Sequence, residues 1–270
     1  LLATYGNGYI SQLAWNPNGS QAAGATSRGV AFFSANGLSY LYTLPSSTPY
    51  NCLAFSPDGS KLAAGGNNGR ISVRDSGSEQ VITELLTGFQ PVVTLAFNQD
   101  GTMLAASTRD NTLHLWDTAT WSKSYTLKGH QFPASALQFS ADGKTLFSYT
   151  AMEQVKRWQL PGGSAGKELY IGIDSMKNSA LAGVLSGDGS CFAAAQDKTV
   201  RIFDTSRGTT LHLIPSFQNR VTAVALNADC SLLGAVDGSR LTVWDILQPA
   251  PLQTLEMPLD VNPGSISFSP

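Results

Sequence analysis

Charged residues, histidines and cysteines are all scarce in this chain. Only 13% of its 270 residues are charged, about half of the ~25% found in an average soluble domain. Helix surfaces depend on charged residues, so the shortage argues against a mainly helical protein. The 26 glycines and the many small polar residues favour an all-β protein with many turns. The net charge of −2 provides no overall positive field that would attract a phosphate backbone.

The three cysteines, Cys52, Cys191 and Cys230, are too few and too scattered for a disulfide scaffold, and no Cys-x-x-Cys pair indicates structural zinc. We expect reduced, buried thiols in an intracellular protein, with a cytoplasmic location and the nucleus as the alternative. The three histidines are spread along the chain, so we predict no metal site and no cofactor. No apolar run approaches the ~20 residues that cross a bilayer, and we expect no membrane partner.

One phrase recurs along the chain and predicts a repeat architecture. Two or three apolar residues precede a tight polar turn, in which Asp or Asn bonds the backbone and Gly takes the left-handed conformation. The copies are LAWNPNG (13–19), LAFSPDG (53–59), LAFNQDG (95–101), LQFSADG (137–143), VLSGDG (184–189), VALNADC (224–230) and ISFSP (266–270). The turn position recurs at Gly19, Gly59, Gly101, Gly143, Gly189 and Cys230.

Each repeat carries signals for four short strands. The apolar start, a second apolar run such as KLAAGG, an alternating run such as TLHLWD and a closing run such as SKSYTL are separated by polar turns. Four strands per ~42 residues are typical of a β-propeller blade. The third strand ends on a second recurrent mark, at Arg74-Asp75, Trp116-Asp117, Trp158-Gln159, Phe203-Asp204 and Trp244-Asp245.

Residues 95–130 resemble a WD repeat from end to end, and the resemblance extends over essentially the whole chain. It implies an all-β WD-repeat β-propeller that forms a single domain over residues 1–270, with six complete four-stranded blades. The blades are expected at approximately residues 10–44, 50–86, 92–127, 134–171, 180–214 and 220–256.

The two ends of the chain align with parts of a further blade. Residues 1–5 match a fourth strand and residues 264–270 match the start of a first strand. Propellers of this family typically close by completing one blade from both ends of the chain. We therefore expect a seven-bladed parent protein that is cut short here by about one hairpin, with a closed six-bladed ring as the alternative.

The resemblance also predicts structural roles for single residues. In WD repeats a His, a Ser or Thr, an Asp and the Trp of one blade form a buried hydrogen-bond chain. The fourth blade has His130 but Met152 in the Asp position, and the third has Asp110 but Phe89 in the His position, so neither chain is complete. The expected structural residues are His130, Asp110, Trp116, Trp158, Trp244 and Asp245.

One segment imitates two catalytic motifs. Residues 162–166, Gly-Gly-Ser-Ala-Gly, formally match the nucleophile elbow of hydrolases and also approach a phosphate-binding loop. The elbow requires a following helix, but KELYIGI indicates a strand. The phosphate loop lacks one residue between its glycines, and Glu168 stands where Ser or Thr is needed. We predict a lengthened loop and no catalytic residue.

Basic and aromatic residues gather in the loops that are expected to face the top of the propeller. A basic residue recurs in the turn between the second and third strands, and aromatic residues occur in the loops that enter each blade. The basic candidates are Arg28, Arg70, Arg109, Lys198 and Arg240, with Arg220 from a neighbouring loop. The aromatic candidates are Tyr50, Phe89, Phe132 and Phe217. The alternative is that the basic residues are solvated turn residues and the aromatic residues pack beneath the loops.

The sequence thus predicts a non-catalytic scaffold that binds a protein or peptide partner on the top face. A positive face favours an acidic or phosphorylated segment, and aromatic and Arg residues contribute much of the energy of interfaces. Nucleic-acid binding through the basic residues is an alternative, as is, more remotely, a propeller enzyme with its site in the channel. Further domains of a larger chain or complex would determine the biology.

Overall fold

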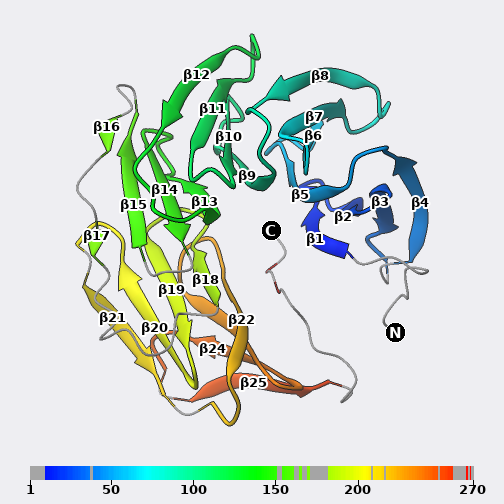
Figure 1. Cartoon of the computed structure of the whole chain (residues 1–270). Coiled ribbons are helices and arrows are strands. Elements are labelled where there is room, and N and C mark those ends of the chain that lie inside the picture. The colour runs from blue at the N-terminus through cyan, green and yellow to red at the C-terminus, as the bar shows by residue number, and fades with distance from the viewer. Residues whose placement is uncertain are drawn as a thin grey trace. The chain divides into compact units, whose positions relative to one another are not determined.

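The computed structural model describes residues 10–36, 39–150, 154–160, 164–165, 169–170, 182–207, 209–215, 217–248, 250–257, 266 and 268. These residues form strands and turns, with no helix among them (Figure 1). The chain divides into two compact units, residues 1–137 and 138–270, and each is described by itself.

The first unit contains three antiparallel sheets, each built from four consecutive strands in chain order. Sequential strands joined by hairpins form the blade of a propeller, and we call these sheets blades one to three. Blade one consists of β1 (Ile10–Trp15), β2 (Gln21–Thr26), β3 (Gly29–Ser34) and β4 (Tyr40–Pro45). Blade two consists of β5 (Tyr50–Phe55), β6 (Lys61–Gly66), β7 (Arg70–Asp75) and β8 (Val81–Leu86). Blade three consists of β9 (Val92–Phe97), β10 (Met103–Thr108), β11 (Leu113–Asp117) and β12 (Lys123–Leu127).

The second unit contains blades five and six and all of blade four except the start of its first strand. Blade four consists of β13 (Ala134–Phe139), within which the unit boundary falls, β14 (Thr145–Thr150), β15 (Gln154–Gln159), β16 (Ser164–Ala165) and β17 (Leu169–Tyr170). Blade five consists of β18 (Ala182–Leu185), β19 (Cys191–Gln196), β20 (Thr199–Asp204) and β21 (Thr210–Ile214). Blade six consists of β22 (Val221–Leu226), β23 (Leu232–Asp237), β24 (Arg240–Asp245) and β25 (Pro251–Glu256). The predicted all-β class and six blades are confirmed.

Blade four differs from the others at its outer edge. Two short strands, β16 and β17, both pair with β15 in place of one continuous outer strand. This is the segment for which the sequence predicts a lengthened loop, and in which residues 162–166 formally match a nucleophile elbow. Ser164 lies in β16, and so it occupies a strand instead of the strained strand-to-helix turn that the elbow requires.

The turn after the first strand of blade two shows why the repeated phrase folds as it does. The Asp58 carboxylate accepts hydrogen bonds from the hydroxyl of Ser56 (2.5 Å) and from the backbone N–H and hydroxyl of Ser60 (3.0 and 2.7 Å). These bonds lower the pKa of Asp58 to about 2. Gly59 follows with φ +70°, in the left-handed region that disfavours a side chain. The same carboxylate-centred turn recurs at Asp142.

Neighbouring blades pack through their sheet faces. Between blades two and three, Ala63, Ile71 and Val73 of blade two are fully buried in one cluster with Leu95 and Trp116 of blade three. The small side chain on the second strand lets the next sheet approach closely, and the larger residues fill the space beside it. The second unit repeats this arrangement between blades five and six.

Two residues near the C-terminus extend this packing to the free face of blade six. Ile266 and Phe268 lie against the position of Gly234, and the repeat aligns Ile266 with Leu95, which packs on blade two. A space of about 230 Å³ remains between them and the sheet. It is lined by Ala225, Gly234, Leu241, Val243, Ile266 and Phe268.

Ile266 and Phe268 lie on the side of blade six where the first strand of a seventh blade is expected. The rest of the segment 264–270, and residues 1–5, which are expected to supply the fourth strand, lie outside the described residues. The seventh blade therefore stays a prediction.

The cysteines correct one expectation. Cys191 and Cys230 form a disulfide with a Cα–Cα distance of 6.1 Å, so the prediction of three reduced thiols is wrong for this pair. Sequence spacing did not show it because the two residues are 39 positions apart and meet only when blades five and six pack. Cys52 is a buried free thiol.

Substitution of two equivalent glycines separates backbone strain from packing between blades. Gly19 and Gly59 both have φ +70°, but a Cβ at Gly19 meets nothing within 4 Å, whereas one at Gly59 collides with Oδ1 of Asn16 in blade one. Asn16 donates from Nδ2 to the Gly59 carbonyl (3.2 Å). We expect Gly19→Ala to lower the unfolding free energy by about 1 kcal/mol, and Gly59→Ala by roughly 1 kcal/mol more, since this hydrogen bond is lost. Urea denaturation measures both, and equal losses would contradict the role of Asn16.

Candidate protein-interaction surface

Two sets of loops are joined at one end of the sheets in the first unit. In each blade, the turn between the second and third strands is hydrogen-bonded to the loop that leaves the fourth strand. The Ser46 N–H donates to the Arg28 carbonyl (2.9 Å), and the Thr87 N–H and hydroxyl donate to the Gly69 carbonyl (3.0 and 2.8 Å). In blade three, Asn111 Nδ2 of this turn donates to the Gln131 carbonyl (2.9 Å). The Arg109 N–H of the same turn donates to the Pro91 carbonyl (3.0 Å), in the loop that leaves the fourth strand of blade two. These bonds fix both sets of loops to each other and to the rigid sheets.

The three basic candidates of the first unit lie in or directly beside these turns. Arg28, Arg70 and Arg109 are exposed. The Arg70 guanidinium pairs with Glu84 on the outer strand of the same blade, at 3.1 Å between Nη1 and Oε2. No ion pair joins Arg28 or Arg109 to a carboxylate among the described residues. Arg28 and Arg109 therefore present their charge to solvent.

The second unit places its basic candidates in the corresponding loops. Lys198 and Arg220 are exposed, and the Lys198 carbonyl accepts a hydrogen bond from the Phe217 N–H (3.2 Å). Arg240 is half-buried and pairs with Glu256 of the outer strand, at 2.9 Å between Nε and Oε1. The structure thus gives each unit its own group of basic turns.

The four aromatic candidates divide into two kinds. Phe89 is 95% exposed and Phe132 is 42% exposed, so both present apolar surface at the loops. Tyr50 is buried in the core of blades one and two. Phe217 is buried between blades five and six, where its ring packs edge to face with that of Trp244, with 6.2 Å between the ring centroids. Tyr50 and Phe217 are therefore core residues in this structure, and their rings are not available as anchors.

Phe89 lies between two basic turns. Its loop is bonded through Thr87 to the turn that carries Arg70, and through Pro91 to Arg109. The turn of Arg109 is bonded on its other side to the loop of Phe132, because Asn111 Nδ2 donates to the Gln131 carbonyl (2.9 Å). These contacts join neighbouring loops that carry, in turn, a basic and an aromatic side chain. We call it the Phe89 surface: Arg70, Phe89, Arg109 and Phe132.

The residues expected to be structural are placed as follows. Trp116, Trp158 and His130 are buried, whereas Trp244 is half-buried. Asp110 accepts hydrogen bonds from the Thr108 hydroxyl (2.5 Å) and the Thr112 N–H (3.3 Å), which tighten its turn. Asp245 accepts from the Leu247 N–H (3.0 Å).

The indole of Trp158 has a partner that the WD-repeat pattern did not indicate. Its Nε1 donates to the Ser148 hydroxyl (2.7 Å) in the interior of blade four. Ser148 lies two positions before Thr150 on β14. The repeat pattern alone does not find Ser148, because the neighbouring blade three has Ala106 in its place.

His114 is buried on the third strand of blade three. Its ring lies 5.9 Å from that of Trp116, and neither nitrogen has a hydrogen-bond partner among the described residues. Burial, and then the nearby positive charge of Lys123, lower the pKa of His114 to about 4. The imidazole is therefore neutral at pH 7.

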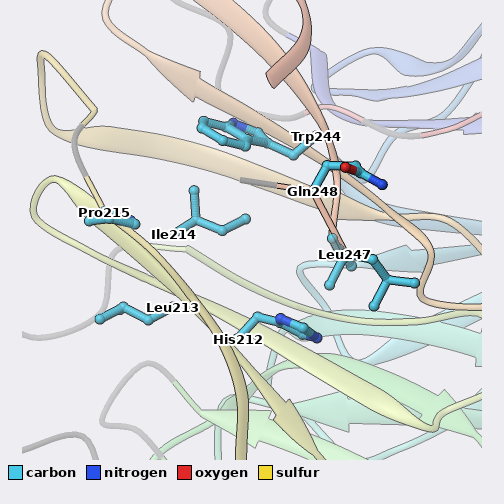
Figure 2. A pocket seen from close by; sticks show the side chains of 8 residues that line it. His212, Leu213, Ile214, Pro215, Trp244, Leu247 and Gln248 are labelled. Atoms are coloured by element: carbon cyan, nitrogen blue, oxygen red, sulfur yellow. The ribbon is translucent and has the colours of Figure 1, made fainter. Parts of the chain in front are cut away.

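An apolar groove in the second unit was not predicted from the sequence. Figure 2 shows side chains of β21 on one wall and of the end of β24 with its following turn on the other. The groove has a volume of about 410 Å³. Between blades two and three, the partly buried Trp121 packs against the corresponding core. The groove is lined by His212, Leu213, Ile214, Pro215, Trp244, Ile246, Leu247 and Gln248.

Chemical sites of other kinds do not emerge from the part of the chain that the structure describes. There, no group of three or more His, Cys, Asp or Glu side chains is arranged to hold a metal ion. The same residues include no helix long and apolar enough to cross a membrane.

Comparison with known proteins identifies the repeats. The family described as "WD domain, G-beta repeat" matches residues 38–75, 80–117 and 121–151. The first two matches each begin near the outer strand of one blade and end with the third strand of the next. No curated protein matches the chain. The three matches and the six blades together support a WD-repeat β-propeller family for this chain. Such propellers are generally non-catalytic platforms that bind protein partners.

The pKa of His114 generates a prediction on stability. Between pH 6.5 and about 4, the unfolded chain binds a proton at His114 that the folded chain does not. Stability in this window therefore falls as the pH is lowered, by up to about 1.4 kcal/mol per pH unit. Chemical denaturation at pH 7, 6 and 5 tests this for the unaltered chain and for His114→Leu. The variant should lose less stability on acidification, and identical slopes would contradict a buried neutral imidazole.

Proposed function

We propose that this chain is a non-catalytic scaffold whose Phe89 surface binds an acidic or phosphorylated segment of a protein partner. The observation that supports it most is the exposure of Phe89, at 95%, between two turns that carry arginines. An isolated aromatic side chain gains about 1.5–3 kcal/mol when it moves from water into an apolar contact. Aromatic and Arg side chains are also the commonest sources of binding energy at protein interfaces.

The charges favour an anionic partner. Arg109 has no carboxylate partner among the described residues, so it can pair with an incoming carboxylate or phosphate without first breaking an ion pair. Arg70 is engaged with Glu84 at the exposed surface, where such pairs contribute little, and it can exchange that partner at small cost. A guanidinium binds both anions through two parallel hydrogen bonds.

The hydrogen bonds between the loops favour binding without rearrangement. Thr87 and Pro91 tie the Phe89 loop to both neighbouring turns, which lowers the entropy that the loop loses on binding. A rigid loop also restricts the shape of the partner. We infer that the segment is extended and places an apolar side chain against Phe89, with an acidic group on the side of Arg109.

Peptide selection on the immobilised chain tests the proposal. Enriched peptides should carry acidic residues beside an apolar one, and Phe89→Ala or Arg109→Ala should each weaken their binding about tenfold or more. Arg207→Ala and Leu252→Ala are matched controls, because these residues are exposed on other parts of the blades, and they should leave binding unchanged. Binding that survives both Phe89→Ala and Arg109→Ala would refute the proposed site.

Nucleic acid as partner is separated by a second probe. A single-stranded oligonucleotide should not bind the chain detectably at physiological salt, whereas the selected peptides should. Tight oligonucleotide binding that falls steeply with salt concentration would indicate counterion release from a phosphate backbone and would replace the peptide proposal.

A further inference from the structure

The disulfide joins blades five and six at a place where other blades are held by weaker contacts. Cys191 begins β19, and Cys230 lies in the turn between β22 and β23. Beside it, the Asp188 N–H of blade five donates to the Ala228 carbonyl of blade six (3.0 Å). The turns that follow the first strands of blades five and six are therefore joined by a covalent bond as well as by a hydrogen bond.

Cys230 occupies a backbone conformation that its own side chain disfavours. Its φ is +62°, and the same turn position in the five preceding repeats is glycine with φ between +66° and +72°. A residue with a Cβ is strained in this region. The turn of blade six thus carries a strained residue, Cys230, and the disulfide bonds this same residue to blade five.

We propose that Cys191 and Cys230 form a redox-operated clamp that fixes blade six to blade five and releases it on reduction. A dithiol is the class of reductant that operates it. One thiolate of the dithiol attacks a sulfur of the clamp, which forms a mixed disulfide and expels the other cysteine as a thiolate. The second thiol of the reductant then displaces the first cysteine. Two electrons and two protons pass to the clamp, and the dithiol becomes a cyclic disulfide.

The third cysteine does not enter this exchange. Cys52 is buried, and burial raises the pKa of its thiol to about 12. The thiolate is the attacking species in thiol–disulfide exchange, so Cys52 is unreactive near neutral pH. The chain therefore alternates between two states, one with the clamp closed and one with it open.

The clamp belongs to the same core as the apolar groove. Cys191 and Cys230 pack in one cluster with Trp244 and Ile246, which also line the groove between blades five and six. Opening the clamp therefore loosens the two blades that form that groove. Because this inference rests on the disulfide and the Cys230 turn, it does not depend on the Phe89 surface.

Counting thiols gives the first test. The purified chain is equilibrated with oxidised glutathione, unfolded in denaturant and titrated with a thiol reagent, with and without prior dithiothreitol. One thiol per chain is expected without dithiothreitol and three with it. Three thiols in the oxidised sample would overturn the clamp.

Cys230→Gly tests the clamp through the direction in which the melting temperature changes. It restores the residue that the five preceding repeats use and so relieves strain, but it also removes the bond. We expect its melting temperature to lie roughly 5–15 °C below that of the oxidised chain, and to be insensitive to dithiothreitol. The reduced unaltered chain should melt lower still, because it keeps the strained Cys230. A variant that melts above the oxidised chain would show that the bond contributes less stability than the strain at Cys230 costs, and would overturn the clamp.

Discussion

The fold depends on small side chains along the second strand of each blade. Ala63 on β6 and Ala106 on β10 are fully buried, as are Ala193 and Ala235 in the second unit. Their size lets one sheet approach the next, and the neighbouring Ile, Val and Leu residues then fill the core. Because this packing fixes the position of each blade against the next, it also fixes where the loops of adjacent blades meet.

The candidate surface follows from that contact. The turn that carries Arg109 and the loop that carries Phe89 meet because blades two and three pack, and the Arg109 to Pro91 hydrogen bond joins them. At the opposite end of the sheets, the same packing brings Asn16 to Gly59 in the first unit and Cys191 to Cys230 in the second. Hydrogen bonds hold the first of these pairs and a covalent bond holds the second.

The repeat in the sequence was sufficient to predict the class and the blades, because each turn is a local event, as at Asp58 and Gly59. Exposure of loop residues was less predictable. Phe89 and Phe217 occupy similar places in the pattern, yet one is exposed and the other is buried against Trp244. The disulfide and the groove beside Trp244 both arise between blades five and six, where the repeat of one blade carries no information.

We propose that hydrogen bonds between loops hold the Phe89 surface rigid before any partner binds. Amide hydrogen exchange on the free chain tests it at the N–H groups of Thr87 and Arg109, which donate to Gly69 and Pro91. We predict strong protection of both amides, close to that of neighbouring strand residues, although they lie at exposed loops. Exchange of both at the rate of an unstructured peptide would show that the loops open freely, and the account of a preformed binding surface would be wrong.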